Sequence, residues 1–318
     1  MSRPQIVIPD DFPPVMALSR VYRELQGRTS VAYFDTLPGS EENLAARVSE
    51  AECVINIRAS SRFTDYVFDR ARHLRLISIW GTGTDNVDLA AAQRHGVTIT
   101  NTPGVAARAV GEHALALLLA AARRIPQVDS AVRHGAWLRG EVLLLHGKTL
   151  GIVGLGAIGR EFARLAASIG MRIVAWTPHP KPELGFEMVP FDDLLARADV
   201  VSLHLRLSPE TKGLIGTRQF GLMKPSAILI NTARGGITDE AALVEALSTH
   251  RIAAAGLDVF ETEPLPEHHP LTRLDNVVLT PHSAGIAPEV VEDGLALAVG
   301  NVWSFLAGKP ANVVVGAC

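Results

Sequence analysis

The chain has 318 residues, of which 47% are hydrophobic, and a formal net charge of −3. This length allows a large core and suits two domains. The near-neutral charge gives no electrostatic reason to expect nucleic acid or a membrane surface as a partner. Two cysteines offer no disulfide framework, so we expect a reducing cytoplasm. The longest apolar stretch, 114–122, is shorter than the ~20 residues that span a bilayer.

Strand-like apolar runs alternate with helix-like segments over the first hundred residues. The predicted strands are 5–8, 31–34, 53–57, 74–80 and 98–100, and the predicted helices are 15–25, 41–48, 66–72 and 89–95. This alternation implies right-handed crossovers and a parallel sheet. The stretch 101–104, N-T-P-G, then interrupts regular structure and is a candidate hinge.

A second α/β series begins after a long apolar helix, 109–122, and a less regular stretch, 129–145. Its predicted strands are 151–153, 172–176, 199–205, 227–231, 254–259 and 277–280. Its predicted helices are 160–169, 191–197, 218–223 and 239–248, and a final helix covers 288–306. Strands separated by helices in this way predict a doubly wound dinucleotide fold.

The stretch 148–159 reads K-T-L-G-I-V-G-L-G-A-I-G and ends in Gly154, Gly156 and Gly159. The order predicts a strand, a tight glycine turn and a helix, in which the glycines allow the turn, the approach of a ligand and close helix packing. The helix N-terminus, with Ala157 and Ile158, offers free N–H groups and a positive dipole to a pyrophosphate. Glycines also serve ordinary turns, but the flanking strand and helix favour a dinucleotide site.

Chemically capable side chains follow three successive strands of this series. Arg234 follows the strand at 227–231, Asp258 and Glu263 follow the next strand, and His282 follows the last one. The carboxyl ends of parallel strands share one edge, where the glycine loop also lies. Each side chain alone has an ordinary explanation as a surface ion pair or a loop residue. Together they provide a carboxylate-binding fork, a proton carrier near neutral pH and an acid that orients the histidine ring.

These motifs resemble those of the D-isomer-specific 2-hydroxyacid dehydrogenase family. The similar stretches are G-L-G-A-I-G, N-T-A-R-G-G, G-L-D-V-F-E-T-E-P and T-P-H-S-A-G, in that order, with W-G-T-G-T-D-N-V-D at 80–88. The resemblance covers essentially the whole chain. It implies an enzyme that transfers a hydride between the nicotinamide of NAD or NADP and a D-2-hydroxy acid or 2-oxo acid.

The resemblance also implies roles for individual residues. Arg234, Glu263 and His282 would be the catalytic trio, with His282 as acid and base. The substrate would be held by Arg234, by the backbone amides of Thr82 and Gly83, and by Arg58. Asp258 would bond the nicotinamide carboxamide. The expected cofactor-binding residues are Gly154, Gly156, Ala157, Ile158, Gly159, Thr177, Thr232, Ala233, Asp258, His282 and Gly285. We expect no bound metal.

The family layout implies two α/β domains, Rossmann-like and flavodoxin-like, with parallel sheets. The substrate domain would comprise residues 1–101 and 286–318, and the inserted NAD(P)-binding domain residues 102–285. The hinges would be 101–104 and 285–288, and their closure would exclude water from a cleft between the domains. Members commonly pair through the cofactor domain, so we expect a homodimer in which 129–145 forms an arm.

One departure from the family pattern concerns the choice of dinucleotide. An acid that binds the ribose hydroxyls is expected about 20 residues past the glycines, and Thr177 stands in its place. Threonine neither accepts two hydroxyl bonds as a carboxylate does nor repels a 2′-phosphate, and His179 and Lys181 are close enough in sequence to help bind one. We expect NAD and leave NADP open. A second departure is Arg206, where the family often has proline.

Other features leave alternatives open. His113 and His204 are interpreted as hydrogen-bonded core or edge histidines. The activity could be that of a D-3-phosphoglycerate dehydrogenase or of a glyoxylate/hydroxypyruvate reductase. A non-enzymatic alternative is a dinucleotide-sensing binding protein similar to the transcriptional co-repressors that keep this fold.

Overall fold

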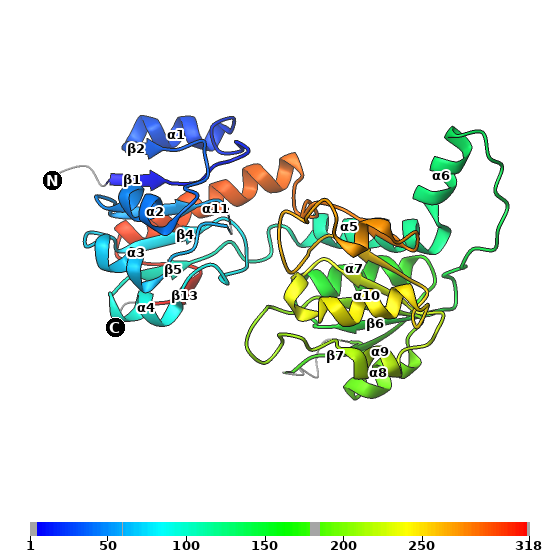
Figure 1. Ribbon diagram of the computed structural model, residues 1–318. Helices are drawn as coiled ribbons and strands as arrows, with labels where there is room; N and C mark the ends of the chain where they lie inside the picture. The colour runs from blue at the N-terminus through cyan, green and yellow to red at the C-terminus, as the bar shows by residue number, and fades with distance from the viewer. Residues whose placement is uncertain (1–4, 59, 179–184, 317–318) are drawn as a thin grey trace. The chain divides into compact units, whose positions relative to one another are not determined.

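The computed structural model describes residues 5–58, 60–178 and 185–316. The chain forms two compact units, which we call the outer unit (Met1–Ala106 with Ile286–Cys318) and the inserted unit (Ala107–Gly285). The chain therefore leaves the outer unit once and returns to it through its last thirty or so residues. Figure 1 follows this path from blue through green and back to red.

The outer unit is built on one sheet. Within the described residues its strands are β1 (Gln5–Ile8), β2 (Ser30–Tyr33), β3 (Cys53–Asn56), β4 (Leu76–Ile79), β5 (Thr98–Thr100) and β13 (Val313–Val315). Their order is β13-β5-β4-β3-β1-β2, the flavodoxin-like arrangement with one antiparallel edge strand, β13. All residues of β3 and β4 are buried because helices cover both faces, which explains their continuous apolar runs.

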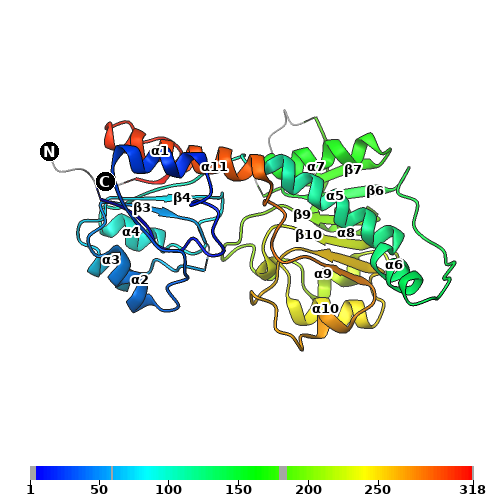
Figure 2. The same ribbon diagram turned by 90° about the horizontal axis from the view of Figure 1, so that it is seen from above.

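Two groups of helices sandwich this sheet (Figure 2). On one face lie α2 (Glu41–Val48), α3 (Asp65–Arg70) and α4 (Leu89–Arg94). On the other lie α1 (Arg20–Arg28) and α11 (Pro288–Leu306). Helix α11 thus completes the core of a unit whose strands come from the first hundred residues.

The predicted start of the first helix is wrong. Helix α1 begins at Arg20 rather than at Val15. The carboxylate of Asp11 accepts the backbone N–H groups of Val15 and Met16 at 2.8 and 2.9 Å, which holds this stretch in a turn. The hydroxyl of Ser19 then caps the helix. Val15 packs against the core from this turn, whereas Leu18 is exposed.

The inserted unit contains the second sheet. Its strands are β6 (Thr149–Val153), β7 (Arg172–Trp176), β8 (Glu187–Met188), β9 (Val200–Leu203), β10 (Ile228–Asn231), β11 (Ala254–Leu257) and β12 (Val277–Leu279). Their order is β12-β11-β10-β9-β6-β7-β8, and every recorded pairing is parallel. The six predicted strands are all present, and the two-residue β8 was not predicted. The order reverses between β6 and β9, where doubly wound sheets bind ligands.

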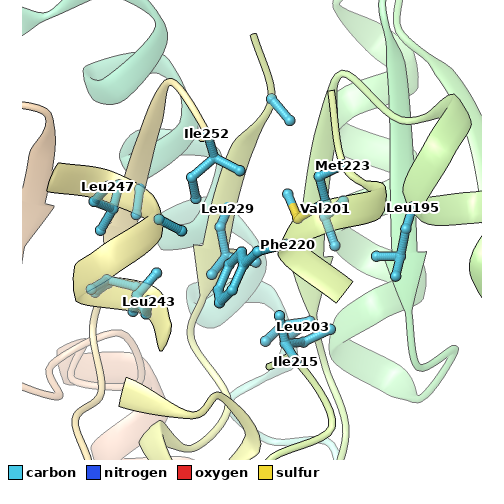
Figure 3. Close-up of a cluster of buried hydrophobic side chains, with 14 of the residues drawn as sticks. Leu195, Val201, Leu203, Ile215, Phe220, Met223, Leu229, Leu243, Leu247 and Ile252 are labelled. Atoms are coloured by element: carbon cyan, nitrogen blue, oxygen red, sulfur yellow. The ribbon is translucent and has the colours of Figure 1, made fainter. Parts of the chain in front are cut away.

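Helices cover both faces of the second sheet. One face carries α5 (Ala107–Arg123) and α7 (Ala157–Ser168). The other carries α8 (Phe191–Arg197), α9 (Thr217–Leu222) and α10 (Glu240–Ser248) (Figures 1 and 2). Figure 3 shows the core of this second face, in which Phe220 lies among the strand residues Val201, Leu203 and Leu229. Two short 3₁₀ helices, Gly235–Ile237 and Pro270–Arg273, precede α10 and β12.

The stretch 129–145 is more regular than predicted at its start. Helix α6 (Ile125–Arg133) includes its first five residues, and the rest has no regular structure. Apolar side chains of this part of the chain are unusually exposed: Ile125, Trp137, Leu138 and Leu144 are 54, 74, 59 and 69% exposed. In the described residues no helix combines the length and apolar character required to cross a bilayer.

Candidate active site

The glycine loop has the geometry that the motif predicts. It follows β6 and leads into α7, with Gly156 as the N-cap residue. Gly154 has φ +103°, and its N–H donates to the carbonyl of Trp176 at 2.8 Å, which ties the turn to the end of β7. A Cβ on Gly156 would meet no atom within 4 Å, and no side chain of the described residues caps α7. Gly156 and Ala157 are exposed at the start of α7, and Ile158 is half-buried.

The end of β7 places Thr177 next to this loop. Thr177 directly follows Trp176, the residue whose carbonyl accepts the Gly154 N–H, and it is half-buried. No carboxylate therefore occupies this first position after β7. His179 and Lys181, the two candidates for a phosphate contact, lie outside the described residues.

The loop after β10 carries Arg234. The side chain of Asn231 shapes this loop: its Oδ1 accepts the Ala233 N–H and its Nδ2 donates to the Arg234 carbonyl, both at 3.0 Å. The Arg234 guanidinium donates to the Ala233 carbonyl at 2.8 Å. Among the described residues, the buried Thr232 Oγ1 has no hydrogen-bond partner. An unsatisfied hydroxyl at this strand end fits a polar ligand group such as those of a dinucleotide.

Glu263 and His282 form a hydrogen-bonded pair in the loops that follow the next two strands. The His282 Nδ1 lies 2.7 Å from the Glu263 Oε2, and the other Glu263 oxygen accepts the Phe260 N–H at 3.0 Å. Because a carboxylate only accepts hydrogen bonds, Nδ1 carries the proton and Nε2 is left for chemistry. The two side chains are 40 and 35% exposed, so a small molecule can reach them.

The electrostatics of Glu263 favour its ionised form. Its partial burial raises its pKa, but the hydrogen bond and charge of His282, the Phe260 N–H and the charge of Arg234 outweigh burial, so the net pKa lies below the ordinary value. Arg234, Glu263 and His282 therefore interact as one electrostatic group. A negatively charged Glu263 fixes the orientation of the His282 ring.

Asp258 is a buried hub beneath the same loops. Its Oδ1 accepts the Ser283 N–H at 2.9 Å and the Thr280 hydroxyl at 2.6 Å, and its Oδ2 accepts the Ala284 N–H at 2.9 Å. Burial raises its pKa, but these bonds and the interaction with the nearby His113 ring outweigh burial and lower the pKa overall. Within the described residues Oδ2 accepts one hydrogen bond, so it has capacity for one more. Gly285, also expected near the cofactor, is the last residue of the inserted unit.

The three expected substrate-binding positions of the outer unit follow β3 and β4. The Arg58 guanidinium donates to the Pro13 carbonyl and lies 5.9 Å from the Trp80 ring centroid, and its Nε is buried with no partner among the described residues. Burial lowers the pKa of Arg58 below its ordinary value. The carbonyl of Thr82, next to Gly83, accepts the Asn101 Nδ2–H at 2.8 Å.

The two histidines interpreted as structural differ in the structure. His204 lies at the end of β9 with its Nε2 2.9 Å from the Ser202 hydroxyl, away from Glu263 and His282 in the recorded contacts. His113, on α5, instead reaches the hub: its Nε2 lies 2.9 Å from the Thr280 Oγ1. No motif in the sequence points to this contact: His113 is one of several polar residues of α5, together with Arg108, Glu112 and Arg123. In the described residues no group of three or more His, Cys, Asp or Glu is arranged to hold a metal ion.

A glycine loop at the switch point and a histidine–glutamate pair at neighbouring strand ends define a dinucleotide-dependent dehydrogenase. The family model for the D-isomer specific 2-hydroxyacid dehydrogenase NAD-binding domain matches residues 115–284. The chain therefore belongs to the D-isomer specific 2-hydroxyacid dehydrogenase family. It is an NAD(P)-dependent oxidoreductase that acts on CH–OH donors.

Individual relatives carry two kinds of name. A D-3-phosphoglycerate dehydrogenase of Archaeoglobus fulgidus is 43% identical over 86% of this chain, which spans 55% of that protein. A glyoxylate reductase of Aeropyrum pernix is 39% identical over 99% of this chain and 96% of its own. Among solved structures, an NADPH-dependent glyoxylate/hydroxypyruvate reductase of Sinorhizobium meliloti, in complex with NADP and malonate, has a TM-score of 0.87 at 29% identity, covering 98% of this chain and 97% of its own.

Proposed function

We propose that the chain reduces a short 2-oxo acid to the D-2-hydroxy acid, or catalyses the reverse oxidation, with Arg234, Glu263 and His282 as its catalytic trio. The observation that carries this proposal is the 2.7 Å contact between His282 Nδ1 and Glu263 Oε2, in loops at the same edge of the sheet as the glycine loop. It supports His282 Nε2 as the atom that exchanges a proton with the C2 oxygen of the substrate.

Each member of the trio has a distinct role in this proposal. In oxidation, His282 accepts the proton of the C2 hydroxyl, and in reduction it returns that proton to the 2-oxo group. Glu263 stabilises the imidazolium that forms in oxidation. Arg234 binds the carboxylate of the acid and polarises its C2 oxygen. Arg58 and the backbone amides of Thr82 and Gly83 are proposed as further substrate contacts.

The residues around the glycine loop suit a dinucleotide, which supplies or accepts the hydride when it is bound. We propose that the N–H groups of α7 at Ala157 and Ile158 hold the pyrophosphate, with Gly154, Gly156 and Gly159 shaping the loop. Thr177 would lie at the adenosine ribose. Thr232, Ala233, Asp258, His282 and Gly285 would line the nicotinamide side, where the unsatisfied Thr232 hydroxyl supports a polar contact.

A steady-state panel tests this function and resolves the substrate class. NADH and NADPH oxidation would be followed with glyoxylate, hydroxypyruvate, 3-phosphohydroxypyruvate and pyruvate. We expect turnover with one of the first two, because relatives that match over nearly their whole length include glyoxylate and glyoxylate/hydroxypyruvate reductases. Selective turnover of the phosphorylated acid would assign a D-3-phosphoglycerate dehydrogenase, and dinucleotide binding without any turnover would favour the sensing protein instead.

We also propose that two copies pair through the stretch 125–145. The exposed Ile125, Trp137, Leu138 and Leu144 would be buried in such a homodimer, which removes apolar surface from water. Sedimentation equilibrium tests this, since Trp137→Asp with Leu138→Asp would then yield a monomer. A monomeric parent chain would refute it. We also propose a cytoplasmic location, because two cysteines offer no disulfide framework.

A further inference from the structure

A chain of side-chain hydrogen bonds leads from α5 to the loop that carries His282. His113 Nε2 lies 2.9 Å from Thr280 Oγ1, and Thr280 Oγ1 lies 2.6 Å from Asp258 Oδ1. His113 Nε2 also lies 3.5 Å from the same Asp258 oxygen. These three residues come from three different elements: the helix α5 and the ends of β11 and β12.

The direction of each hydrogen bond follows from which atoms carry a proton. The pKa of Asp258 lies below its ordinary value, so its carboxylate is ionised at neutral pH and only accepts hydrogen bonds. The Thr280 hydroxyl must therefore donate its single proton to Asp258. Its oxygen then accepts from His113, which places a proton on the His113 Nε2 whether or not the ring is charged. In this series His113 donates, the Thr280 hydroxyl accepts from His113 and donates to Asp258, and Asp258 accepts.

Asp258 also bonds the backbone of His282 and of the two residues that follow it. Its carbonyl accepts the His282 N–H at 2.8 Å, and its carboxylate accepts the N–H groups of Ser283 and Ala284, both at 2.9 Å. His282 itself has φ +52°, in the left-handed region that non-glycine residues rarely occupy. Such a conformation is strained and persists only when its surroundings over-determine it. The Asp258 hub supplies that constraint.

We propose that His113 and Thr280 are positioning residues for His282, acting through Asp258. The inference rests on the proposed role of His282 as acid and base. His113 orients the Thr280 hydroxyl, Thr280 and three backbone N–H groups fix Asp258, and Asp258 fixes the loop that aims the His282 ring at Glu263. A histidine on the apolar helix α5 thereby serves the proton transfer without touching the substrate.

Two near-isosteric variants test this series of hydrogen bonds. Thr280→Val removes the hydroxyl but keeps the shape, and His113→Phe removes the donor but keeps a ring. We expect each to lower kcat about 10-fold or more, because small misplacement of a catalytic group is costly, with less than about a 3-fold change in the KM of the 2-oxo acid. Thr249→Val is the matched control: Thr249 is exposed, its hydroxyl bonds the Glu245 carbonyl, and its loss should leave kcat unchanged.

A second readout separates this inference from the proposed function. In ¹⁵N-histidine-labelled protein with dinucleotide added, the Nδ1–H proton of His282, assigned by its loss in His282→Asn, should be slow to exchange because it is bonded to Glu263. We expect it to exchange at least about 10-fold faster in Thr280→Val and His113→Phe, because a displaced His282 ring would lose part of its hydrogen bond to Glu263. Parental exchange and kcat in both folded variants would overturn the inference. If the parent chain turns over no 2-oxo acid, the proposed function fails and the exchange rates alone decide.

Discussion

A Cβ atom on Gly159 would lie 2.1 Å from the carbonyl oxygen of Gly154. The two glycines are five positions apart, one before the turn and one inside the first turn of α7. Their contact sets how closely α7 approaches β6, and thereby where the helix N-terminus points. The spacing of the motif is thus a packing requirement as well as a binding signal.

Gly159→Ala should therefore disturb the loop. The methyl group would overlap a backbone atom, which cannot move cheaply, so we expect a loss of about 1–3 kcal/mol in the free energy of unfolding and weaker binding of NADH. Urea unfolding and a fluorescence titration measure the two effects. Gly221→Ala in α9 is the matched control, since its Cβ would meet no atom within 4 Å and alanine favours a helix. Equal behaviour of the two variants would contradict the packing argument.

His282→Asn should abolish proton transfer while the dinucleotide still binds. We expect kcat to fall by about 10²- to 10⁴-fold, the range attributed to general acid–base catalysis, with little change in the dissociation constant of NADH. Asparagine tolerates the left-handed backbone of this position. His250→Asn is a matched control, because His250 is exposed and has φ +53°. Retained turnover in His282→Asn would remove this residue from the mechanism.

Arg234→Lys should impair recognition of the acid although it keeps the charge. Lysine cannot form the paired hydrogen bonds of a guanidinium with a carboxylate. We expect a rise in the KM of the 2-oxo acid and a lower kcat, together about 10- to 100-fold in kcat/KM. Arg218→Lys, whose parent side chain is exposed and pairs with Asp192, should leave both constants unchanged. Wild-type constants in Arg234→Lys would place the substrate carboxylate elsewhere.

Thr177→Asp should shift the choice of dinucleotide towards NADH. A carboxylate at the end of β7 would accept hydrogen bonds from the ribose hydroxyls and repel a 2′-phosphate. We expect the ratio of kcat/KM for NADH to that for NADPH to rise about 10-fold or more, following the tenfold change per 1.4 kcal/mol. A ratio equal to that of the parent chain would show that Thr177 does not lie beside the ribose.

His204 should make the inserted unit sensitive to mild acid. Burial lowers its pKa from 6.5 to about 3, so only the unfolded chain binds a proton between these values. The contribution of neutral His204 to the free energy of unfolding is therefore complete above pH 6.5, and it is lost as the pH falls below that value. We expect His204→Gln to reduce the loss of unfolding free energy between pH 7 and pH 5 by about 1–2 kcal/mol. The exposed His134→Gln should not, and identical pH profiles for His204→Gln and the parent would contradict a buried neutral ring.

Local pattern determined most of the fold. Alternating apolar runs and helical periodicity gave every strand of the inserted unit except β8, whose two residues are too few for a period to appear. They also predicted the edge of each sheet at which the site residues lie, because parallel strands bring their carboxyl ends together. Arg58 and Thr82 follow strands of the first sheet, and Arg234, Glu263 and His282 follow strands of the second. The start of α1 was wrong because the acceptor that holds residues 15–17 is Asp11, outside the helical pattern.

What the sequence alone determined is the set of chemical groups and their order: a glycine loop, an arginine, two acids and a histidine on successive strand ends. Only the tertiary structure decided which of these groups share hydrogen bonds. It paired Glu263 with His282, made Asp258 the hub of the 280–284 loop, and brought His113 to Thr280 across 167 residues of chain. The periodicity of a sequence reports the structure of a few neighbouring residues. A hydrogen bond between residues far apart in the chain requires two atoms within about 3 Å, and only the packing of helices and loops brings them that close.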